Sequence, residues 1–584
     1  MSDFGHGAVG TREQAFTALL PLRAEGYPAH LLVNLAASIK ADVDTVKDGA
    51  DPEENLWVPA GYTYFGQFID HDLTFDNTSS LNPADQAEPG KLDRLPTNLR
   101  TPRFDLDSLY GDGPDAQPFM YGDDGASLLL KDSFENQCQS SFDQAHQDLL
   151  RSPNGRAIIG DKRNDENSIV NQIHLTFIKF HNAVVAKLKM TNSDLKGTAL
   201  FTKASQEVRW TYQKLVIEDF LPRIVQSKAF EDLKAKSIEA RKPRYALYKE
   251  DKRTNLPLEF VGAAYRFGHS GVRFGYRLNA ETSLSIFPAS EATSGADSLL
   301  GFDPLPQSHV IDDWGRFFPS TGSTENDLPV KGLGEEPKTK IGKDGKEEAI
   351  PNPAVRLQFA YKIDPTLADP LTVLPSNVLP TSPNKGGALE EVDKAIKADP
   401  IPEKDPDKRD RSRPSLALLN LLRGNSYKIQ GGQAIAKVLK DNGHPVEPLA
   451  PKYLVTRQSV DKCGKTFFKF VPIDPALLHD TPLWFYILAE AQAPIVDKVR
   501  LEHDGTFPEE QFLEPNIAKT QLGWVGGRIV AEVFYGLMDS DKDSYFHAPL
   551  GWKPIWEHDP SACHKTIFAN LLKFAGQHIT HPSV

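Results

Sequence analysis

Residues 65–76 read Phe-Gly-Gln-Phe-Ile-Asp-His-Asp-Leu-Thr-Phe-Asp, and this stretch decides the fold assignment. In a helix, Gln67, Asp70 and His71 are spaced i, i+3 and i+4, so their side chains share one face. Asp72 lies about 100° further round and points elsewhere. One helix could therefore serve a polar site and supply a separate carboxylate ligand. A His-Asp doublet alone is common on surfaces and also occurs in metal-dependent phosphohydrolases, so other motifs must support the assignment.

Residues 101–111, TPRFDLDSLYG, place four residues at alternate positions, which an extended chain turns to one side. These residues are Thr101, Arg103, Asp105 and Asp107. Oxygen atoms from a threonine, two aspartates and the Arg103 backbone carbonyl suit a hard cation such as Ca²⁺. A solvated acidic loop before a Tyr-Gly turn is the alternative interpretation.

Residues 159–167, IGDKRNDEN, precede a segment with helical apolar spacing over 168–190. Arg163 and Glu166 are spaced i, i+3 near the start of that helix. The helix dipole favours acidic residues there, so capping alone can explain Asp165 and Glu166.

Two later segments contain a histidine, an asparagine and two arginines. Residues 263–272, AAYRFGHSGV, place Arg266 three positions before His269. Residues 419–423, LNLLR, contribute Asn420. A single histidine on an apolar helix is more often a core residue than a ligand, so these segments carry weight only together with the others.

Residues 65–75 resemble the distal-helix signature of the animal-type haem peroxidases, in the peroxidase–cyclooxygenase superfamily, and the chain is similar to bacterial members. The resemblance implies that His71 is the general acid–base and that Gln67 lies near a small-anion site. It also implies an ester link between Asp70 and a haem methyl group. Residues 101–111 resemble the calcium loop of the same family, with Asp72 as the ligand from the distal helix. Asp107 stands where a serine is common.

The remaining motifs resemble the family in the same order. Arg163 would line the distal cavity and Glu166 would form a second haem ester. Asn167 replaces the methionine that forms a sulfonium link in the chlorinating enzyme, so that link should be missing and efficient chloride oxidation is not expected.

On the proximal side, the resemblance makes His269 the ligand of the haem iron. Asn420 would accept the imidazole N–H and so fix the orientation of the ring. Arg266 and Arg423 would pair with the haem propionates, because guanidinium groups suit carboxylates.

The resemblance predicts a mainly α fold: a single large helical haem-peroxidase domain with long irregular loops and little strand. We expect an N-terminal extension over 1–55 and the peroxidase domain over 56–575. The interval between the two proximal motifs is longer than in the family, which predicts an insertion within 320–410.

Apolar residues recur at helical spacing in several segments, and we predict helices over 31–46, 168–190, 202–225, 259–270, 415–422, 432–441, 483–496 and 525–537. His174 and His181 are expected to be packed within the second of these helices. The Asp-Gly-Lys sequence at 344–346 predicts an exposed hairpin.

Composition excludes several classes of protein. Of 584 residues, 66 are basic and 79 acidic, a net charge of −13 that argues against nucleic acid or anionic membrane as partner. Cys138, Cys463 and Cys563 form neither a disulfide framework nor a CxxC site. No basic stretch followed by an apolar run opens the chain, which predicts a protein without a standard secretory signal, either cytoplasmic or non-classically secreted. The apolar runs are too short to span a bilayer.

The resemblance thus implies a peroxidase with haem b and Ca²⁺, acting through a ferryl porphyrin-radical intermediate in the response to oxidative stress. Hydrogen peroxide would be the oxidant. Bromide, iodide, thiocyanate or phenols would be the donors. His71 would transfer the peroxide proton, and Arg163 would stabilise charge during O–O cleavage.

Three alternatives come from other classes. A fatty-acid dioxygenase of the same superfamily needs a radical-forming tyrosine three residues before the proximal histidine, where Arg266 stands; Tyr265 is one position away. An adhesive protein would be indicated by an Arg-Gly-Asp or Lys-Gly-Asp tripeptide, and none occurs. A metal-dependent phosphohydrolase would show no Soret absorption.

Overall fold

A computed structural model describes most of the chain. The described residues are 14–40, 51–75, 97–131, 147–234, 245–249, 251, 253, 255–288, 297–320, 339–341, 347–349, 356–372, 374, 415–514, 516–558 and 566–579.

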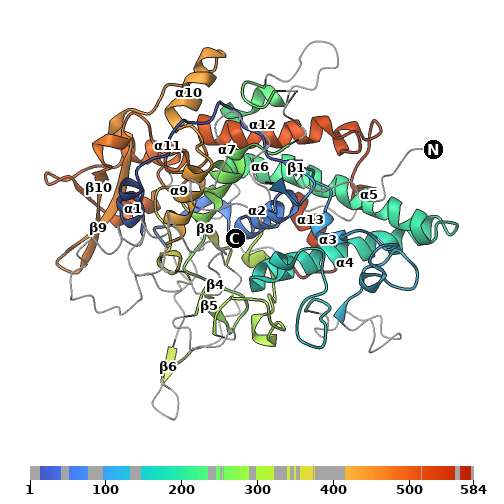
Figure 1. Ribbon diagram of the computed structural model, residues 1–584. Helices are drawn as coiled ribbons and strands as arrows, with labels where there is room; N and C mark the ends of the chain where they lie inside the picture. The colour runs from blue at the N-terminus through green and yellow to red at the C-terminus, as the bar shows by residue number, and fades with distance from the viewer. Residues whose placement is uncertain are drawn as a thin grey trace.

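Helices are the main regular elements of the described structure (Figure 1), which confirms the predicted mainly α fold. The longer helices are α1 (Ala29–Ala37), α2 (Gly61–Leu73), α4 (Ser168–Thr191), α5 (Gly197–Leu215), α9 (Leu416–Ser426), α10 (Gly432–Asp441), α11 (Leu483–Lys498), α12 (Trp524–Ser540) and α13 (Ile567–Phe574). Shorter ones are α3 (Asp107–Tyr110), α6 (Leu221–Ile224) and α7 (Leu258–Gly262).

Helix α2 lies near the centre of the view in Figure 1, with α4 and α5 on one side and α9, α10 and α11 on the other. Phe65 and Phe68 on α2 are fully buried. Phe68 stacks on Phe177 of α4, with ring centroids 4.8 Å apart, and meets Tyr212 of α5 edge-on at 6.1 Å. Aromatic packing on this face fixes the rotation of α2, and Gln67, Asp70 and His71 lie on the other side of the helix.

A 3-10 helix, Ala264–His269, follows α7 directly and lies across the core from the aromatic face of α2. The Trp484 indole on α11 donates to the Arg266 carbonyl at 3.1 Å. Within α12, an i, i+4 ion pair joins Arg528 Nε to Glu532 Oε1 at 2.6 Å, and both side chains are fully buried. The hydrogen bond from Trp484 ties the 3-10 helix to α11.

Strands are few and short. They form the pairs β1 (Gln14–Ala15) with β3 (Thr97–Asn98), β2 (Glu54–Pro59) with β8 (Phe359–Tyr361), β4 (Gly275–Arg277) with β5 (Ser283–Ser285) and β6 (Thr339–Ile341) with β7 (Glu347–Ala349), and one sheet in the order β11 (Thr506–Pro508), β10 (Lys465–Pro472), β9 (Val455–Lys462). All pairs are antiparallel. The β6–β7 pair confirms the predicted hairpin. Most of the predicted insertion lies outside the described residues.

The described residues before 56, which are 14–40 and 51–55, contribute side chains to the common core. Phe16 and Leu32 are buried in it. The Tyr27 amide donates to Asn425 Oδ1 of α9 at 2.6 Å. No helix in the described part of the chain is long and apolar enough to cross a membrane.

Candidate active site

A cavity of about 530 Å³ lies between α2 and the 3-10 helix that ends at His269. It gathers side chains from segments hundreds of residues apart in sequence. The residues predicted to act on or hold a haem all line it: Gln67, Asp70, His71, Arg163, Glu166, Arg266, His269, Asn420 and Arg423.

His71 projects from α2 and is 4% exposed. Its Nδ1 lies 2.8 Å from Asn164 Oδ1, and Asn164 Nδ2 lies 3.0 Å from Nδ1 of His174. Burial lowers the pKa of His174 to about 3, so that ring is neutral and accepts from the amide. With the amide in this orientation, its oxygen accepts a hydrogen bond from the Nδ1–H of His71, which leaves the lone pair of His71 on Nε2. Nε2 lies 3.5 Å from Glu166 Oε1.

Asn164 was missed in the sequence. It is fully buried in the 3-10 turn Lys162–Asp165, and the signal that could have found it is weak: buried amides are nearly always hydrogen-bonded. His174 is buried, as expected of a packed histidine, but it also contacts this amide.

Two carboxylates reach the cavity from separate segments. Gln67 Nε2 donates to Glu166 Oε1 in a short hydrogen bond. The Thr74 hydroxyl donates to Asp70 Oδ1 at 3.2 Å. Asn167 accepts from the Ile169 amide as the N-cap of α4.

Arg163 has contacts that the sequence did not predict. Its Nη2 donates to the His71 carbonyl at 3.0 Å and to the Thr74 carbonyl, and it pairs with Asp161 at 2.8 Å. Arg163 thus lies on the cavity wall and also holds the last turn of α2.

The proximal side is organised around His269. Nδ1 of His269 lies 2.9 Å from Asn420 Nδ2, while the buried Oδ1 of Asn420 has no partner among the described residues. Rotating the amide by half a turn brings that oxygen to the Nδ1 proton and satisfies both groups. Burial, with a smaller contribution from the Arg266 charge, lowers the pKa of His269 to about 3. A neutral imidazole with a free Nε2 lone pair is the form that ligates metals.

Tyr265 also faces the cavity. Its hydroxyl donates to the Gly66 carbonyl on α2 at 3.2 Å, bridging the two walls. This contact was not expected, because Tyr265 is offset by one position from the dioxygenase pattern.

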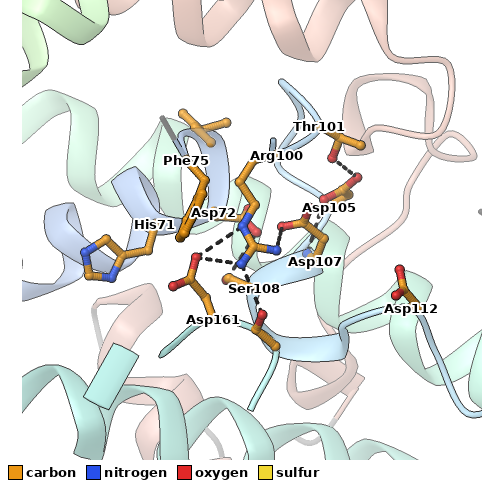
Figure 2. A network of polar contacts seen from close by, with 12 residues as sticks. His71, Asp72, Phe75, Arg100, Thr101, Asp105, Asp107, Ser108, Asp112 and Asp161 are labelled. Carbon is orange, nitrogen blue, oxygen red and sulfur yellow. Dashed lines mark hydrogen bonds and ion pairs between the residues drawn. The ribbon is translucent and has the colours of Figure 1, made fainter. Parts of the chain in front are cut away.

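A cluster of carboxylates lies beside α2 (Figure 2). Oxygen atoms of Asp72, Asp105 and Asp107 lie within 4.8 Å of one another. Burial, then the charges of Asp105 and Asp107, raise the pKa of Asp72 well above its usual range. The buried Oδ2 of Asp72 has no hydrogen-bond partner among the described residues. The Thr101 hydroxyl donates to Asp105 Oδ2 at 2.6 Å. This oxygen set fits a hard cation, which would relieve the repulsion.

The Arg103 side chain pairs with a carboxylate outside this cluster. It is 56% exposed and lies 3.9 Å from Asp541. Only the backbone carbonyl of Arg103 figures in the predicted cation site.

Residues 81–313 match the family model for animal haem peroxidase. This match covers less than half of the chain, and over it the chain is similar to the animal haem peroxidases. The matched range includes Arg163, Glu166 and His269, while α2 and Asn420 lie outside it and join the site only through the fold.

Curated proteins similar to this chain align over a limited stretch. Dual oxidase from Drosophila melanogaster is 23% identical over 140 residues, which are 24% of this chain and 8% of that protein. Myeloperoxidase from Mus musculus is 27% identical over 144 residues, 24% of this chain and 19% of that protein. The chain therefore spans less than a fifth of the length of either relative.

Among solved structures, peroxidase A from Dictyostelium discoideum aligns with a TM-score of 0.54 and 14% identity. The alignment covers 98% of this chain and 95% of that one. At this identity the likeness concerns the fold, a mainly helical peroxidase fold.

Proposed function

We propose that this protein is a haem-dependent peroxidase that reduces hydrogen peroxide and oxidises small anions, such as bromide, iodide or thiocyanate, or phenolic donors. The observation that carries the proposal is the pair of buried histidines, His71 and His269. Both line one cavity from opposite elements, and each has an asparagine at its Nδ1.

The cavity residues fit a haem. His269 would ligate the iron through Nε2, with Asn420 setting the orientation of the ring. Arg266 and Arg423 on the same wall would meet the propionate carboxylates. Asp70 and Glu166 would form ester links, and Asn167 cannot form a sulfonium link. When bound, haem supplies the iron that binds peroxide and the electrons that reduce it.

The protein's own part in catalysis is proton transfer. His71 Nε2 would take a proton from one oxygen of hydrogen peroxide and deliver it to the other, which leaves as water, while bound haem would supply the two electrons. The His71 imidazolium formed meanwhile donates from Nδ1 to Asn164 Oδ1, which stabilises it. Arg163 adds positive charge at the cavity wall. Calcium at Asp72, Asp105 and Asp107, with Thr101 and the Arg103 carbonyl, would hold α2 in place.

The test is a stopped-flow measurement of the reaction with hydrogen peroxide. Replacing His71 by alanine should leave haem bound and slow the reaction by roughly 10²-fold or more. An unchanged rate in that variant would contradict the proposal.

A fatty-acid dioxygenase is the second candidate, because Tyr265 reaches the cavity despite its offset in sequence. Oxygen uptake with a long-chain fatty acid distinguishes the two functions. A dioxygenase would consume oxygen and lose this activity in Tyr265→Phe, whereas a peroxidase would show no uptake.

A further inference from the structure

Arg100 is a buried arginine between the carboxylate cluster and the distal helix (Figure 2). Its Nη1 lies 3.3 Å from Asp107 Oδ1, within the cluster. Its Nη2 lies 2.6 Å from Asp161 Oδ2 and donates to the Gly160 carbonyl at 3.1 Å. Arg100 is 8% exposed, so little solvent screens these pairs.

Asp161 carries the connection onward. It is 1% exposed and is shared by two arginines, Arg100 and Arg163. Arg163 in turn holds the carbonyls of His71 and Thr74. The two guanidinium groups also lie near the Phe75 ring, at 5.7 Å and 4.7 Å from its centroid. An unbroken series of contacts therefore runs from the carboxylate cluster to the last turn of α2.

The cluster and its series of contacts carry a net negative formal charge. The groups that make up the cluster and the series are Asp72, Asp105, Asp107, Asp161, Arg100 and Arg163, so four negative charges stand against two positive ones, or −2. Arg209, which donates to the Asp105 carbonyl at 2.6 Å, and the Arg103–Asp541 pair border this set. Without Arg100 the imbalance would be −3. Arg100 therefore neutralises part of the negative charge that a bound cation would also neutralise.

We propose that Arg100 is an internal counter-cation of the cluster, which competes with a bound divalent cation for Asp107 and transmits occupancy of the site to α2 through Asp161 and Arg163. The inference rests on the cation site of the proposed function and is independent of peroxidase activity. In the absence of calcium, Arg100 offsets the charge of Asp107. When calcium binds, Asp107 is shared between the two cations, so Arg100 lowers calcium affinity.

The central variant is Arg100→Gln, which keeps hydrogen-bond donors and removes the charge. Removing it should tighten calcium binding by roughly 5- to 150-fold, the usual range of coupling between two sites. Since linkage is reciprocal, the same change should lower the melting temperature far more in a chelator than in saturating calcium. Both are measured on the full chain as purified, by calcium titration calorimetry and thermal unfolding.

Two further variants separate charge from packing. Arg100→Lys keeps the positive charge and should remain close to wild type in both measurements. Arg151→Gln is the matched control, because Arg151 is also buried and pairs with two carboxylates, Asp148 and Asp165, away from the cluster. It should destabilise the protein equally with and without calcium.

Coupling to α2 is read by hydrogen exchange in peptides covering 61–75. Calcium should slow exchange there in the wild type, and Asp161→Asn should abolish the difference. The proposal is overturned if Arg100→Gln lowers the melting temperature equally in both conditions with unchanged calcium affinity. It is also overturned if Arg100→Lys behaves like Arg100→Gln, if Arg100→Gln does not fold even in calcium, or if Asp161→Asn keeps the calcium effect. If the wild type does not bind calcium, the cation site of the proposed function is wrong. If the wild type binds calcium but does not react with peroxide, the proposed peroxidase activity is wrong and the calcium results for Arg100 still hold.

Discussion

Replacing Asn164 by leucine tests the orientation of the distal histidine. The substitution keeps the branching of the side chain and removes the oxygen that accepts from His71 Nδ1 at 2.8 Å. A buried hydrogen bond to a charged group contributes about 1.5–3 kcal/mol, and each 1.4 kcal/mol is about tenfold in rate. Because the imidazolium exists only after His71 takes the peroxide proton, the loss falls on the transition state. The peroxide reaction should slow by roughly 10- to 150-fold.

The assay is the bimolecular rate constant with hydrogen peroxide by stopped flow, with the Soret band confirming bound haem. Asn171→Leu is the matched control, since Asn171 on α4 is also buried and donates to Asp165 at 2.7 Å. It should lower stability without slowing the reaction. If Asn164→Leu reacts within twofold of wild type, Asn164 does not support the proton transfer and the reasoning fails.

The remaining predictions concern the ester links and stability. After peroxide treatment, denaturing chromatography with mass spectrometry should find two haem esters, one lost in Asp70→Val, one in Glu166→Gln and both in the double variant; haem released unmodified from the wild type would contradict this. Burial lowers the pKa of His181 to about 4, below an unfolded value near 6.5, so its contribution to stability is complete above pH 6.5 and falls away toward pH 4. Between pH 6.5 and pH 4, urea unfolding should show that the free energy of unfolding falls by about 3 kcal/mol more in the wild type than in His181→Phe. The same pH dependence of that free energy in both proteins would refute the prediction.

Sequence patterns predicted the helices whose apolar spacing matches their burial. The range 432–441 agrees with α10, and 168–190 with α4 to within a residue. Tertiary packing overrode the pattern elsewhere. The helix expected over 202–225 passes through a π-helical turn at Val216–Phe220, and that expected over 259–270 breaks at Ala263 into α7 and a 3-10 helix. Helical spacing alone cannot report such changes of pitch.

The site divides in a similar way. His71 and Asp70 share the cavity-facing side of α2, as their spacing indicated, and the two proximal motifs meet at 2.9 Å between His269 and Asn420. Contacts that depend on tertiary structure were missed. Asn164 is hydrogen-bonded to His71, which lies 93 residues away in sequence. The spacing of residues along the sequence does not predict such a contact.

The most direct test of a haem held between His71 and His269 is the absorption spectrum of His269→Gly with and without imidazole. Wild-type protein should bind haem as a high-spin ferric species. His269→Gly should lose this spectrum and regain it when imidazole enters the space left by the ring. A wild-type spectrum in His269→Gly without imidazole, or a wild-type chain that takes up no haem, would contradict the account.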